Sequence, residues 1–567
     1  MLYILILGFF WFIRTAKAIL FWVYLWQLKE YHLGRFKAHF STEKGRHLLF
    51  NKLLILKLVL AFGFFFYNIF LPLAFELANI SEFLDFLTKA IFLPFILLIL
   101  YSFESVWGLK NLVQRKLKKP VLTKKTIPIL FFAFILFISI PVLLWQKIQQ
   151  SQLIFDFPVL HKFCFWLLII DIFTPLVISL IVLFFQPLTV LWRSWIIRKA
   201  KKKRKRFKNL LVIGITGSYG KTSTKEFLYA ILSEKFGKEK VLKTKEHQNS
   251  EVGISQCILR DLKPEHKIFI CEMGAYNKGG IKLLCAIVRP QIGILTGINQ
   301  QHLATFGSQE NIINTKFELL ESLPENGIAI FNIDNEYIDL EVKKRELKVK
   351  SKFYSVRNKL DIWAEDVRVE REFISFKVFS KDGDSAQFKV DLLGLQNVEN
   401  ILASACCAKE LGMNLEEISK ACAKIKPMPG SGRLIKNKQG LNIIEASYSA
   451  NPNGVISHLQ YLRIWPGKKI IIMPCLIELG KASKKVHQDI GKEIGKVCDL
   501  AIITAKECYN NVKGPAVESG MPEQNILFLE NSKQIFKKVN AFAKEGDVVL
   551  LEGRVSKELI KLLSVNY

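Results

Sequence analysis

The chain has 567 residues and a formal net charge of +30, and this length accommodates about three or four domains. Half of the residues are hydrophobic, and the mean hydropathy of +0.23 is high for a soluble protein. The ten cysteines lack the paired spacing of a metal centre, so we expect buried free thiols in a reducing compartment.

The hydrophobic excess lies in the first 192 residues, which contain five long apolar segments. They are Leu2–Trp26, Leu53–Phe75, Ala90–Trp107, Ile127–Trp145 and Phe163–Trp192. Each is close to the ~20 residues that a membrane-spanning helix requires. The first segment carries Arg14 and Lys17, so it could instead lie in the membrane interface or be re-entrant. It lacks the small-residue site of a cleaved signal peptide.

Basic and non-basic loops alternate between these segments. Residues 109–126 hold seven Lys and Arg and no acid, and residues 193–208 hold ten in sixteen positions. Such runs can bind nucleic acid or anionic lipid, but directly after an apolar segment the positive-inside rule explains them best. The sequence therefore predicts a multi-pass protein of the cytoplasmic membrane, with its N-terminus outside and the residues after 193 in the cytoplasm. The lipid bilayer is an expected partner, and nucleic acid is not.

Asp171 lies within the last apolar segment, where an ionised side chain is costly. It could mark a binding or proton site, or it could face a neighbouring helix that supplies a partner or lie near the membrane interface. We favour the second interpretation because no other motif accompanies this acid. No repeat or dense array of intramembrane charges indicates a transporter.

After residue 208, short β-rich apolar runs alternate with helical patterns, which is typical of a largely parallel sheet. The expected strands are Leu211–Ile215, Ile268–Cys271, Ile292–Thr296, Ile328–Asn332, Leu441–Glu445, Lys469–Met473, Leu500–Thr504 and Val548–Glu552. Residues 353–390 have the pattern of antiparallel strands, and residues 427–432 that of a hinge. The expected domains are a transmembrane helical domain (1–195), a basic cytoplasmic linker (196–208), a central P-loop ATPase-like α/β domain (209–430) and a Rossmann-like C-terminal α/β domain (431–567).

The most informative motif is GITGSYGKTS, from Gly214 to Ser223. A strand, a glycine turn and a helix start can cradle a phosphate, because the turn's N–H groups and the helix N-terminus face the anion. Lys221 would reach the outer phosphates and Thr222 would contact Mg²⁺. The strict P-loop pattern has a glycine where this chain has Ile215, so this is a shortened variant, G-x-x-G-K-T. The residues predicted to hold the nucleotide phosphates are Gly217, Ser218, Gly220, Lys221, Thr222 and Ser223.

Six further motifs follow in order: HQNSEVG (247–253), ICEMGAYNKGGI (270–281), GINQQHLATFGS (297–308), LGLQNVENILAS (393–404), EASYSANP (445–452) and IELG (477–480). With the glycine loop, their order and spacing resemble the Mur ligases, the ATP-dependent amide-forming enzymes of cell-wall precursor synthesis. The resemblance is greatest to the members that add D-alanyl-D-alanine to a UDP-linked tripeptide, and it covers about residues 208–567.

The resemblance implies roles for residues outside the glycine loop. Glu272 would hold Mg²⁺ at the end of a strand beside the loop's strand. His302 would help to bind a second metal ion, and a carbamylated Lys316 would bridge the metals. Asn397 would contact adenine, and Arg433 would reach from the hinge to a phosphate. The ordinary alternatives are a surface carboxylate, a solvated histidine, a helix-surface lysine, a helix-capping asparagine and a solvated arginine.

The chemistry that the resemblance implies is acyl activation. A carboxylate attacks the γ-phosphate of ATP to give an acyl phosphate and ADP, and an amine then displaces phosphate. Phosphoryl transfer requires positioning and charge neutralisation, and Lys221, His302 and Lys316 would be the catalytic residues. Mg²⁺ would be held by Thr222, Glu272 and His302. The implied partners are a UDP- or lipid-linked muramyl peptide and D-Ala-D-Ala or another amino-acid acceptor.

Three departures from the family pattern concern the substrates. A membrane domain stands where the most similar members have a soluble UDP-gripping domain, which suggests a lipid-linked substrate. The family's D-D-S-Y-N-A-N-P reads EASYSANP here, with Ala446 and Ser449, and its G-D-M reads Met473-Pro474-Cys475. Two alternatives therefore stay open: a membrane ligase that extends a polyglutamate-like polymer, and a non-catalytic nucleotide-binding scaffold. Intact Lys221, Thr222 and Glu272 argue against the scaffold.

Overall fold

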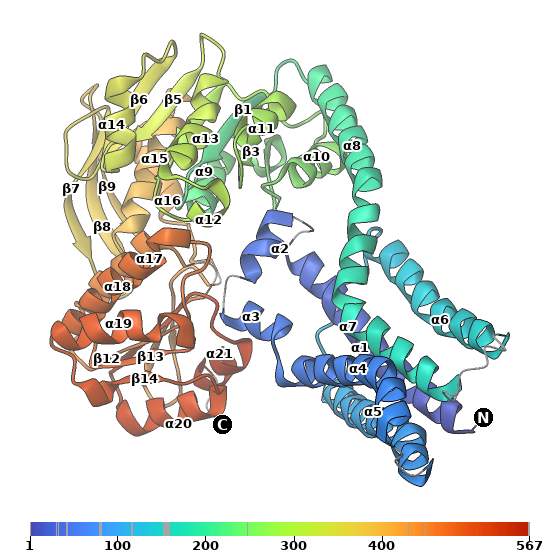
Figure 1. Ribbon diagram of the computed structural model, residues 1–567. Helices are drawn as coiled ribbons and strands as arrows, with labels where there is room; N and C mark the ends of the chain where they lie inside the picture. The colour runs from blue at the N-terminus through green and yellow to red at the C-terminus, as the bar shows by residue number, and fades with distance from the viewer. Residues whose placement is uncertain are drawn as a thin grey trace. The chain divides into compact units, whose positions relative to one another are not determined.

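The computed structural model describes the chain except residues 1, 30, 32, 41–42, 79–81, 115–116, 151–158, 247, 429, 448–449 and 565–567. The chain forms two compact units, Met1–Arg193 and Ser194–Tyr567 (Figure 1).

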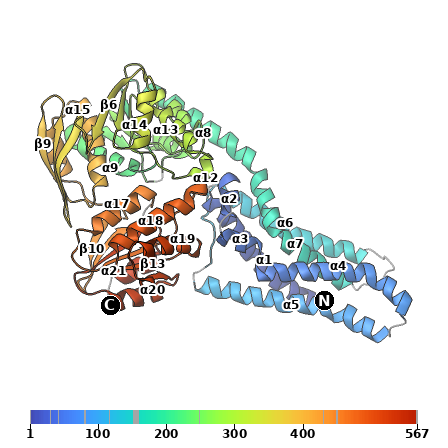
Figure 2. The ribbon, with the colours of Figure 1, turned by 60° about the vertical axis from the view of Figure 1, so that its left-hand side comes forward.

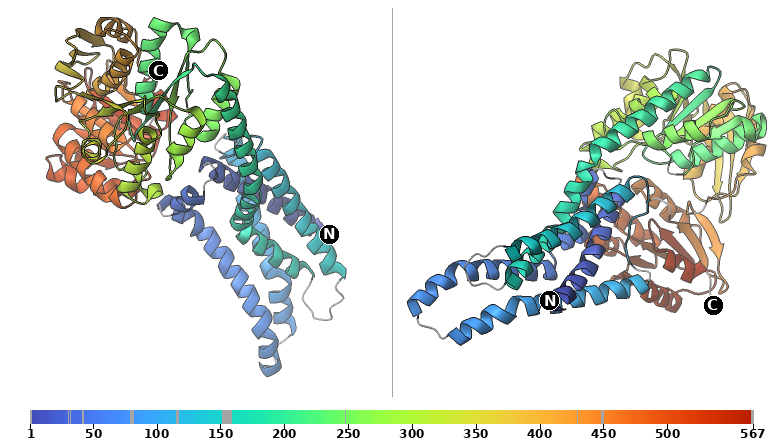
Figure 3. Two further views of the ribbon diagram at one scale, coloured as in Figure 1. Left: turned by 90° about the horizontal axis from the view of Figure 1, so that it is seen from above. Right: turned by 90° about the vertical axis from the view of Figure 1, so that its right-hand side faces the viewer.

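The first unit is helical throughout its described elements. These are α1 (Leu2–Leu28), α2 (Leu33–His39), α3 (Glu43–Leu49), α4 (Lys52–Ala78), α5 (Glu82–Val113), α6 (Thr126–Gln150), α7 (Val159–Phe184) and the start of α8 (Gln186–Arg206). Helix α1 packs against α5, α6 and α7 (Figure 3). Five stretches of the described residues are long and apolar enough to cross a membrane: Tyr3–Leu28, Gly45–Phe66, Pro94–Val113, Thr126–Gln146 and Lys162–Arg206. Each overlaps one of the five predicted segments.

Asp171 is buried inside this unit and has partners on other helices. Its carboxylate contacts Arg14 of α1 and lies 2.8 Å from Nζ of Lys57 on α4. Glu104 of α5 lies 2.6 Å from Lys57 and 3.5 Å from Arg14. Two cations and two anions from four helices therefore form one ion-pair cluster, as expected for an Asp171 that faces partnered neighbours. The sequence showed no such array, because its members meet only when the helices pack.

The second unit begins with a nine-stranded sheet in the order β2-β3-β1-β4-β5-β6-β7-β8-β9. Its strands are β1 (Leu211–Thr216), β2 (Val241–Lys243), β3 (Ile268–Glu272), β4 (Ile292–Leu295), β5 (Ile328–Asn332), β6 (Lys350–Ser355), β7 (Ile362–Val369), β8 (Ile374–Ser380) and β9 (Ser385–Val390). The four strands predicted before residue 333 lie within one residue of β1, β3, β4 and β5. The antiparallel prediction is wrong for β6, which pairs parallel with β5 and β7. It is confirmed for β7, β8 and β9.

Helices cover both faces of this sheet. On one face lie α9 (Lys221–Phe236), α15 (Gln396–Glu410) and α16 (Leu415–Cys422). On the other lie the end of α8, α10 (Glu251–Arg260), α11 (Gly280–Val288), α12 (Leu303–Phe306), α13 (Gln309–Glu321) and α14 (Glu336–Lys344). Side chains alternate along a strand, so Ile213 and Ile215 enter the first core and Val212 the second. Burial on both faces explains the nearly continuous apolar runs of these strands.

The basic run after residue 193 is part of helix α8 as far as Arg206, although residues 196–208 were expected to form a linker. Ile197 and Ala200 join the hydrophobic core of the second unit. The guanidinium of Arg204 is buried and donates to the carbonyl of Val288 at 2.8 Å. At least one cation of this run is therefore a structural anchor of the α/β unit.

A second sheet has the order β10-β11-β15-β12-β13-β14, and only β10 is antiparallel to its neighbour. Its strands are β10 (Arg433–Lys436), β11 (Asn442–Ala446), β12 (Lys469–Met473), β13 (Leu500–Ile503), β14 (Ile526–Phe528) and β15 (Val548–Glu552). One face carries α17 (Pro452–Leu462), α18 (Ser483–Val497) and α19 (Lys506–Glu518), and the other α20 (Ser532–Phe542) and α21 (Lys557–Ser564) (Figure 2). Both sheets thus have helices on two faces. The predicted hinge precedes β10, with residue 429 outside the described residues.

The expectation that all ten cysteines are free thiols is wrong for one pair. Cys475 and Cys508 form a disulfide, and the other eight cysteines are free and buried. The two partners are 33 residues apart and meet at the ends of neighbouring elements, after β12 and at the start of α19. Sequence spacing does not reveal such a pair.

Candidate functional site

Several of the predicted functional residues follow or end strands of the nine-stranded sheet at the edge formed by the carboxyl ends of those strands. Strands β3, β1, β4 and β5 are parallel neighbours, so their carboxyl ends meet where open α/β sheets bind ligands. The glycine loop 217–220 follows β1, Glu272 ends β3, and His302 comes after β4. Ile215 of β1 is in register with Glu272 of β3, which confirms the predicted position of this carboxylate beside the loop's strand.

The glycine loop accepts only glycine at two positions. A Cβ at Gly217 would lie 2.2 Å from Oγ1 of Thr296 and 3.0 Å from the carbonyl oxygen of Gly297. Gly220 has φ +77°, and a Cβ there would lie 2.6 Å from Oδ1 of Asn400. The loop is therefore pressed between the segment after β4 and helix α15, which leave no room for a side chain at these two positions.

Helix α9 begins directly after this loop, with Lys221, Thr222 and Ser223 in its half-buried first turn. The Lys221 ammonium donates to the carbonyl of Gly217 at 2.7 Å and to that of Ser218 at 3.2 Å. Burial lowers the pKa of Lys221, which nearby Glu272 partly offsets. A buried ammonium and the free N–H groups of a helix N-terminus form an anion site.

Glu272 is buried and held by two side chains. Nζ of Lys225 lies 3.2 Å from one carboxylate oxygen, and Nδ2 of Asn249 donates to the other at 3.1 Å. Burial favours a higher pKa for Glu272, but Lys225, Lys221 and the Asn249 hydrogen bond lower it below its ordinary value. The carboxylate is thus kept ionised and oriented, with acceptor capacity left for a cation.

Sequence reasoning missed both partners of Glu272. Lys225 lies one helical turn beyond Lys221, and this i, i+4 spacing on α9 was the available signal. Asn249 belongs to the motif HQNSEVG, whose first residue, His247, is outside the described residues.

His302 forms a pair with a residue of the C-terminal sheet domain. Its Nδ1 bonds Oε2 of Glu478, which belongs to the IELG motif. Both are non-glycine residues with left-handed backbone, at φ +66° and +65°, a strain that is typical of functional sites. Burial lowers the pKa of His302 below its ordinary value; Glu478 opposes this and nearby Lys316 adds to it. A neutral imidazole is the form that binds a metal ion.

Lys316 of α13 is 3% exposed, with its Nζ 5.9 Å from the centre of the Phe306 ring. Burial and then the charge of Lys221 lower its pKa to about 7. The ordinary alternative, a helix-surface lysine, is therefore wrong. A buried lysine with this pKa is a candidate for chemistry on its neutral amine.

Three further hydrogen bonds join the C-terminal sheet domain to this edge. Nδ2 of Asn299 donates to Oδ1 of Asn453 at 2.8 Å and to that of Asn451 at 3.2 Å. The N–H of Ala304 donates to the carbonyl of Glu478 at 3.1 Å. Asn451 belongs to the motif EASYSANP, of which residues 448 and 449 are outside the described residues. The two motifs of the C-terminal domain thus meet the segment after β4.

The structure gives the two remaining predicted residues partners outside this group. Nδ2 of the buried Asn397 donates to the carbonyl of Leu393 at 2.9 Å. Arg433 pairs at 3.0 Å with Glu445 on the adjacent strand of its own sheet and is half exposed. The residues brought together are therefore Lys221, Glu272, His302 and Lys316, because the charge of Lys221 shifts the pKa of each of the other three.

Two family models match the second unit. The Mur ligase middle domain matches residues 215–408, and the Mur ligase glutamate ligase domain matches residues 432–555. The first range covers most of the nine-stranded sheet and its helices, and the second covers the six-stranded sheet.

Curated relatives carry one name, UDP-N-acetylmuramoyl-tripeptide–D-alanyl-D-alanine ligase. The protein from Bacillus subtilis is 27% identical over 359 residues, covering 62% of this chain and 75% of the relative. The protein from Escherichia coli is 30% identical over 282 residues, covering 50% of this chain and 61% of the relative. The chain thus spans between three fifths and three quarters of these two relatives.

A solved structure of a Mur ligase is also similar to this chain. The MurF ligase from Thermotoga maritima in complex with ADP superposes with a TM-score of 0.57 and is 27% identical, covering 66% of this chain and 83% of that chain. A pseudomurein peptide ligase type C from Methanothermus fervidus, with a TM-score of 0.50 and 19% identity, shares the fold.

Proposed function

Because this chain belongs to the Mur ligase family, we propose that it is an ATP-dependent, ADP-forming ligase that forms an amide bond on a peptide of a cell-wall precursor. One observation carries the proposal: a glycine loop with its Lys221 follows β1, Glu272 ends the neighbouring parallel strand β3, and His302 follows β4 at the same edge of the sheet. D-Ala-D-Ala is the proposed amine substrate, as the names of the relatives suggest.

The glycine loop fits the phosphates of ATP. Positions 217 and 220 have no room for a side chain, so backbone N–H groups can approach the phosphates closely, as in a P-loop. Lys221 would exchange the loop carbonyls for phosphate oxygens. Asn397 would lie toward the adenine side and Arg433 toward the phosphates, roles carried over from the family resemblance.

Mg²⁺ fits the donors next to the loop: the Thr222 hydroxyl, the Glu272 carboxylate and the His302 imidazole. When bound, Mg²⁺ would neutralise charge on the transferred phosphoryl group. Lys225 and Asn249 orient Glu272 for this contact, and Glu478 holds the tautomer and position of His302. A carbamylated Lys316 would add an anionic metal ligand.

The reaction proposed is attack of the peptide carboxylate on the γ-phosphate, followed by attack of the amine on the acyl phosphate. The chain's residues position the reactants and balance charge, which phosphoryl transfer mainly requires. The contacts of Asn299 and Glu478 would hold the C-terminal domain over the loop and exclude water from the acyl phosphate.

We also propose that the first unit crosses the cytoplasmic membrane and that its helices replace the UDP-gripping domain, so that the peptide substrate is lipid-linked. The five apolar stretches and the alternating loop charges support this proposal. We further propose that the six-stranded sheet forms a Rossmann-like domain and that this domain holds the amine substrate.

The test is release of ADP by the purified full chain, supplied with MgATP, a muramyl tripeptide and a panel of amines that includes D-Ala-D-Ala and glutamate. We expect ADP release only when peptide and amine are both present, and D-Ala-D-Ala as the best amine. Preference for glutamate would instead support the polymer-extending alternative. No ADP release with any pair, from a chain that elutes as a folded species, would contradict ligase activity.

A further inference from the structure

Three potential metal ligands meet in the C-terminal sheet domain, away from the glycine loop. Cys475 follows strand β12, His487 lies on α18, and Cys508 lies in the first turn of α19. Their ligand atoms all lie within 4.8 Å of one another. His487 is completely buried and Cys508 nearly so, whereas Cys475 is partly exposed.

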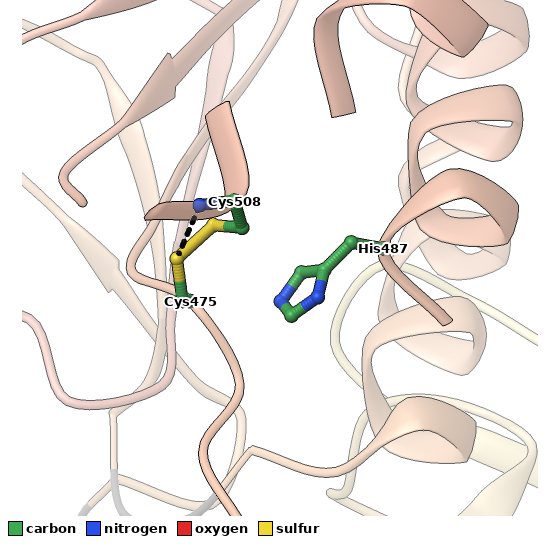
Figure 4. A group of neighbouring side chains, drawn as sticks. All are labelled: Cys475, His487 and Cys508. Carbon is green, nitrogen blue, oxygen red and sulfur yellow. Dashed lines mark hydrogen bonds between the residues drawn. A yellow bond between two sulfur atoms is a disulfide. The ribbon is translucent and has the colours of Figure 1, made fainter. Parts of the chain in front are cut away.

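His487 is held in the tautomer that binds metal through Nε2. Its Nδ1 bonds the carbonyl oxygen of Ser483 at 2.7 Å, so Nδ1 carries the proton. Nε2 accepts the N–H of Leu476 at 3.0 Å, so Nε2 is unprotonated and its electron pair is engaged by that N–H. Figure 4 shows the imidazole with one nitrogen on the side of the two sulfur atoms. Metal-binding histidines usually donate their other N–H to a carbonyl in this way.

The surroundings of the cysteines favour thiolates once the disulfide is reduced. Cys508 lies at the N-terminus of a helix of 13 residues, where negative charge is stabilised. The N–H of Cys508 donates to Sγ of Cys475 at 3.1 Å (Figure 4). An N–H in the first turn of a helix has no acceptor within the helix, and here the sulfur atom is its acceptor.

We propose that Cys475, Cys508 and Nε2 of His487 bind Zn²⁺ in the reduced chain, and that the disulfide is the oxidised form of the same site. A dithiol reductant supplies two electrons and two protons: the S–S bond breaks, two thiols form, and the reductant becomes a disulfide. Zn²⁺ then displaces the two thiol protons and the N–H of Leu476 from Nε2. Two thiolates and a neutral imidazole give an uncharged site.

Zinc is the metal that these ligands select. Thiolate and imidazole favour Zn²⁺ over Mg²⁺ or Ca²⁺. Three protein ligands leave one tetrahedral position for water, and the partly exposed Cys475 gives access to it. In the reducing cytoplasm that the proposed topology gives to this unit, thiols are the maintained form.

The proposed zinc site includes Cys475, and the segment that follows Cys475 contacts the proposed ligase site. Glu478, three residues after Cys475, binds His302 and accepts the N–H of Ala304. Exchange between the disulfide and bound zinc would therefore change the bonding of Cys475, which begins the segment 475–478. This segment contacts the first sheet domain through Glu478. The zinc site itself does not depend on ligase activity.

The experiment measures bound zinc in the full chain without ATP or substrates. The chain is reduced, freed of reductant without oxygen, equilibrated with Zn²⁺, desalted and analysed for metal by mass spectrometry. We expect about one zinc per reduced chain and almost none in the oxidised chain. Cys475→Ser and Cys508→Ser should remove the zinc, and His487→Gln should weaken zinc binding at least about tenfold. Co²⁺ in the reduced chain should show thiolate charge-transfer absorption.

Cys498→Ser is the matched control, because Cys498 is a buried free cysteine of the same domain outside the cluster. It should retain zinc and the wild-type thermal midpoint within a few degrees. The proposal is overturned if the folded, reduced wild type holds no more zinc than Cys475→Ser, or if the oxidised chain holds as much as the reduced one.

Discussion

At the scale of single residues, the lowered pKa of Lys316 leads us to predict that the ligase activity depends on carbon dioxide. With a pKa of about 7, most of this amine is neutral at pH 8, and a neutral amine reacts with CO₂ to give a carbamate. We expect bicarbonate to restore ADP release to enzyme that has been depleted of CO₂ at pH 8. Lys316→Arg should lose about 10²–10³-fold in kcat with or without bicarbonate, because a guanidinium stays charged.

The control for Lys316 is Lys282→Arg, an exposed lysine on neighbouring α11. It should respond to bicarbonate like the wild type. Activity that is independent of bicarbonate in fully depleted enzyme would contradict carbamylation.

A second residue-scale prediction concerns pH. His458 of α17 lies 2.7 Å from the buried Glu552. Burial alone would lower the pKa of His458, but Glu552 raises it above 6.5. The histidine therefore adds stability that is fully present below pH 6.5 and is lost as the pH rises through the folded-state pKa.

His458→Gln tests this pH dependence. The variant should lose about 1.5–3 kcal/mol of unfolding free energy at pH 6 and much less at pH 9. The measurement is hydrogen exchange of the α17 peptide in the full chain. His266→Gln, in an exposed loop of the other sheet domain, is the control for the substitution itself, and an equal loss for His458→Gln at both pH values would contradict the charged pair.

At the scale of elements, the helices of the first unit depend on their buried ion pairs. Asp171→Leu leaves Arg14 and Lys57 with one carboxylate, and an uncompensated buried charge costs about 3–5 kcal/mol. We expect a strongly lowered thermal midpoint in detergent. The double variant Arg14→Leu/Asp171→Leu keeps the Lys57–Glu104 pair and should regain most of that loss. A single variant as stable as the wild type would contradict a structural role of the cluster.

The elements that the sequence predicted well are those buried on both faces. Strands β1, β5, β12 and β15 appear as apolar runs because helices cover both sides of each sheet. The three-residue strands β2 and β14 are too short to leave a pattern, and β10 is an edge strand with two exposed residues. The direction of β6 depends on its neighbours in the sheet, which its own residues do not encode.

The candidate site also contains residues that the sequence predicted and residues that it did not. The motif residues Lys221 and Glu272 were predictable, because the loop and the strand end are local features. Their partners were not: Asn249 and Glu478 reach the site through contacts between distant segments. Lys316 could be named from the resemblance, but its burial required the fold.

At the scale of the whole molecule, the account predicts the form of the peptide substrate. If the helices of the first unit cross the membrane and replace a UDP-gripping domain, kcat/KM should be higher for a lipid-linked muramyl tripeptide in vesicles than for the UDP-linked tripeptide. We expect a difference of about tenfold or more, equal to ~1.4 kcal/mol. Soluble substrate should show no gain when empty vesicles are added. A clear preference for the UDP-linked form would contradict the proposed role of the first unit.

The most direct measurement is equilibrium binding of MgATP to the purified full chain, compared with Lys221→Ala and with Lys235→Ala, an outward-facing lysine at the far end of the same helix. The wild type and Lys235→Ala should bind MgATP with equal affinity and more tightly than ATP without Mg²⁺, whereas Lys221→Ala should bind at least about tenfold more weakly. A wild-type chain that fails to bind MgATP, or a Lys221→Ala chain that binds it unchanged, would contradict the nucleotide site on which the ligase function rests.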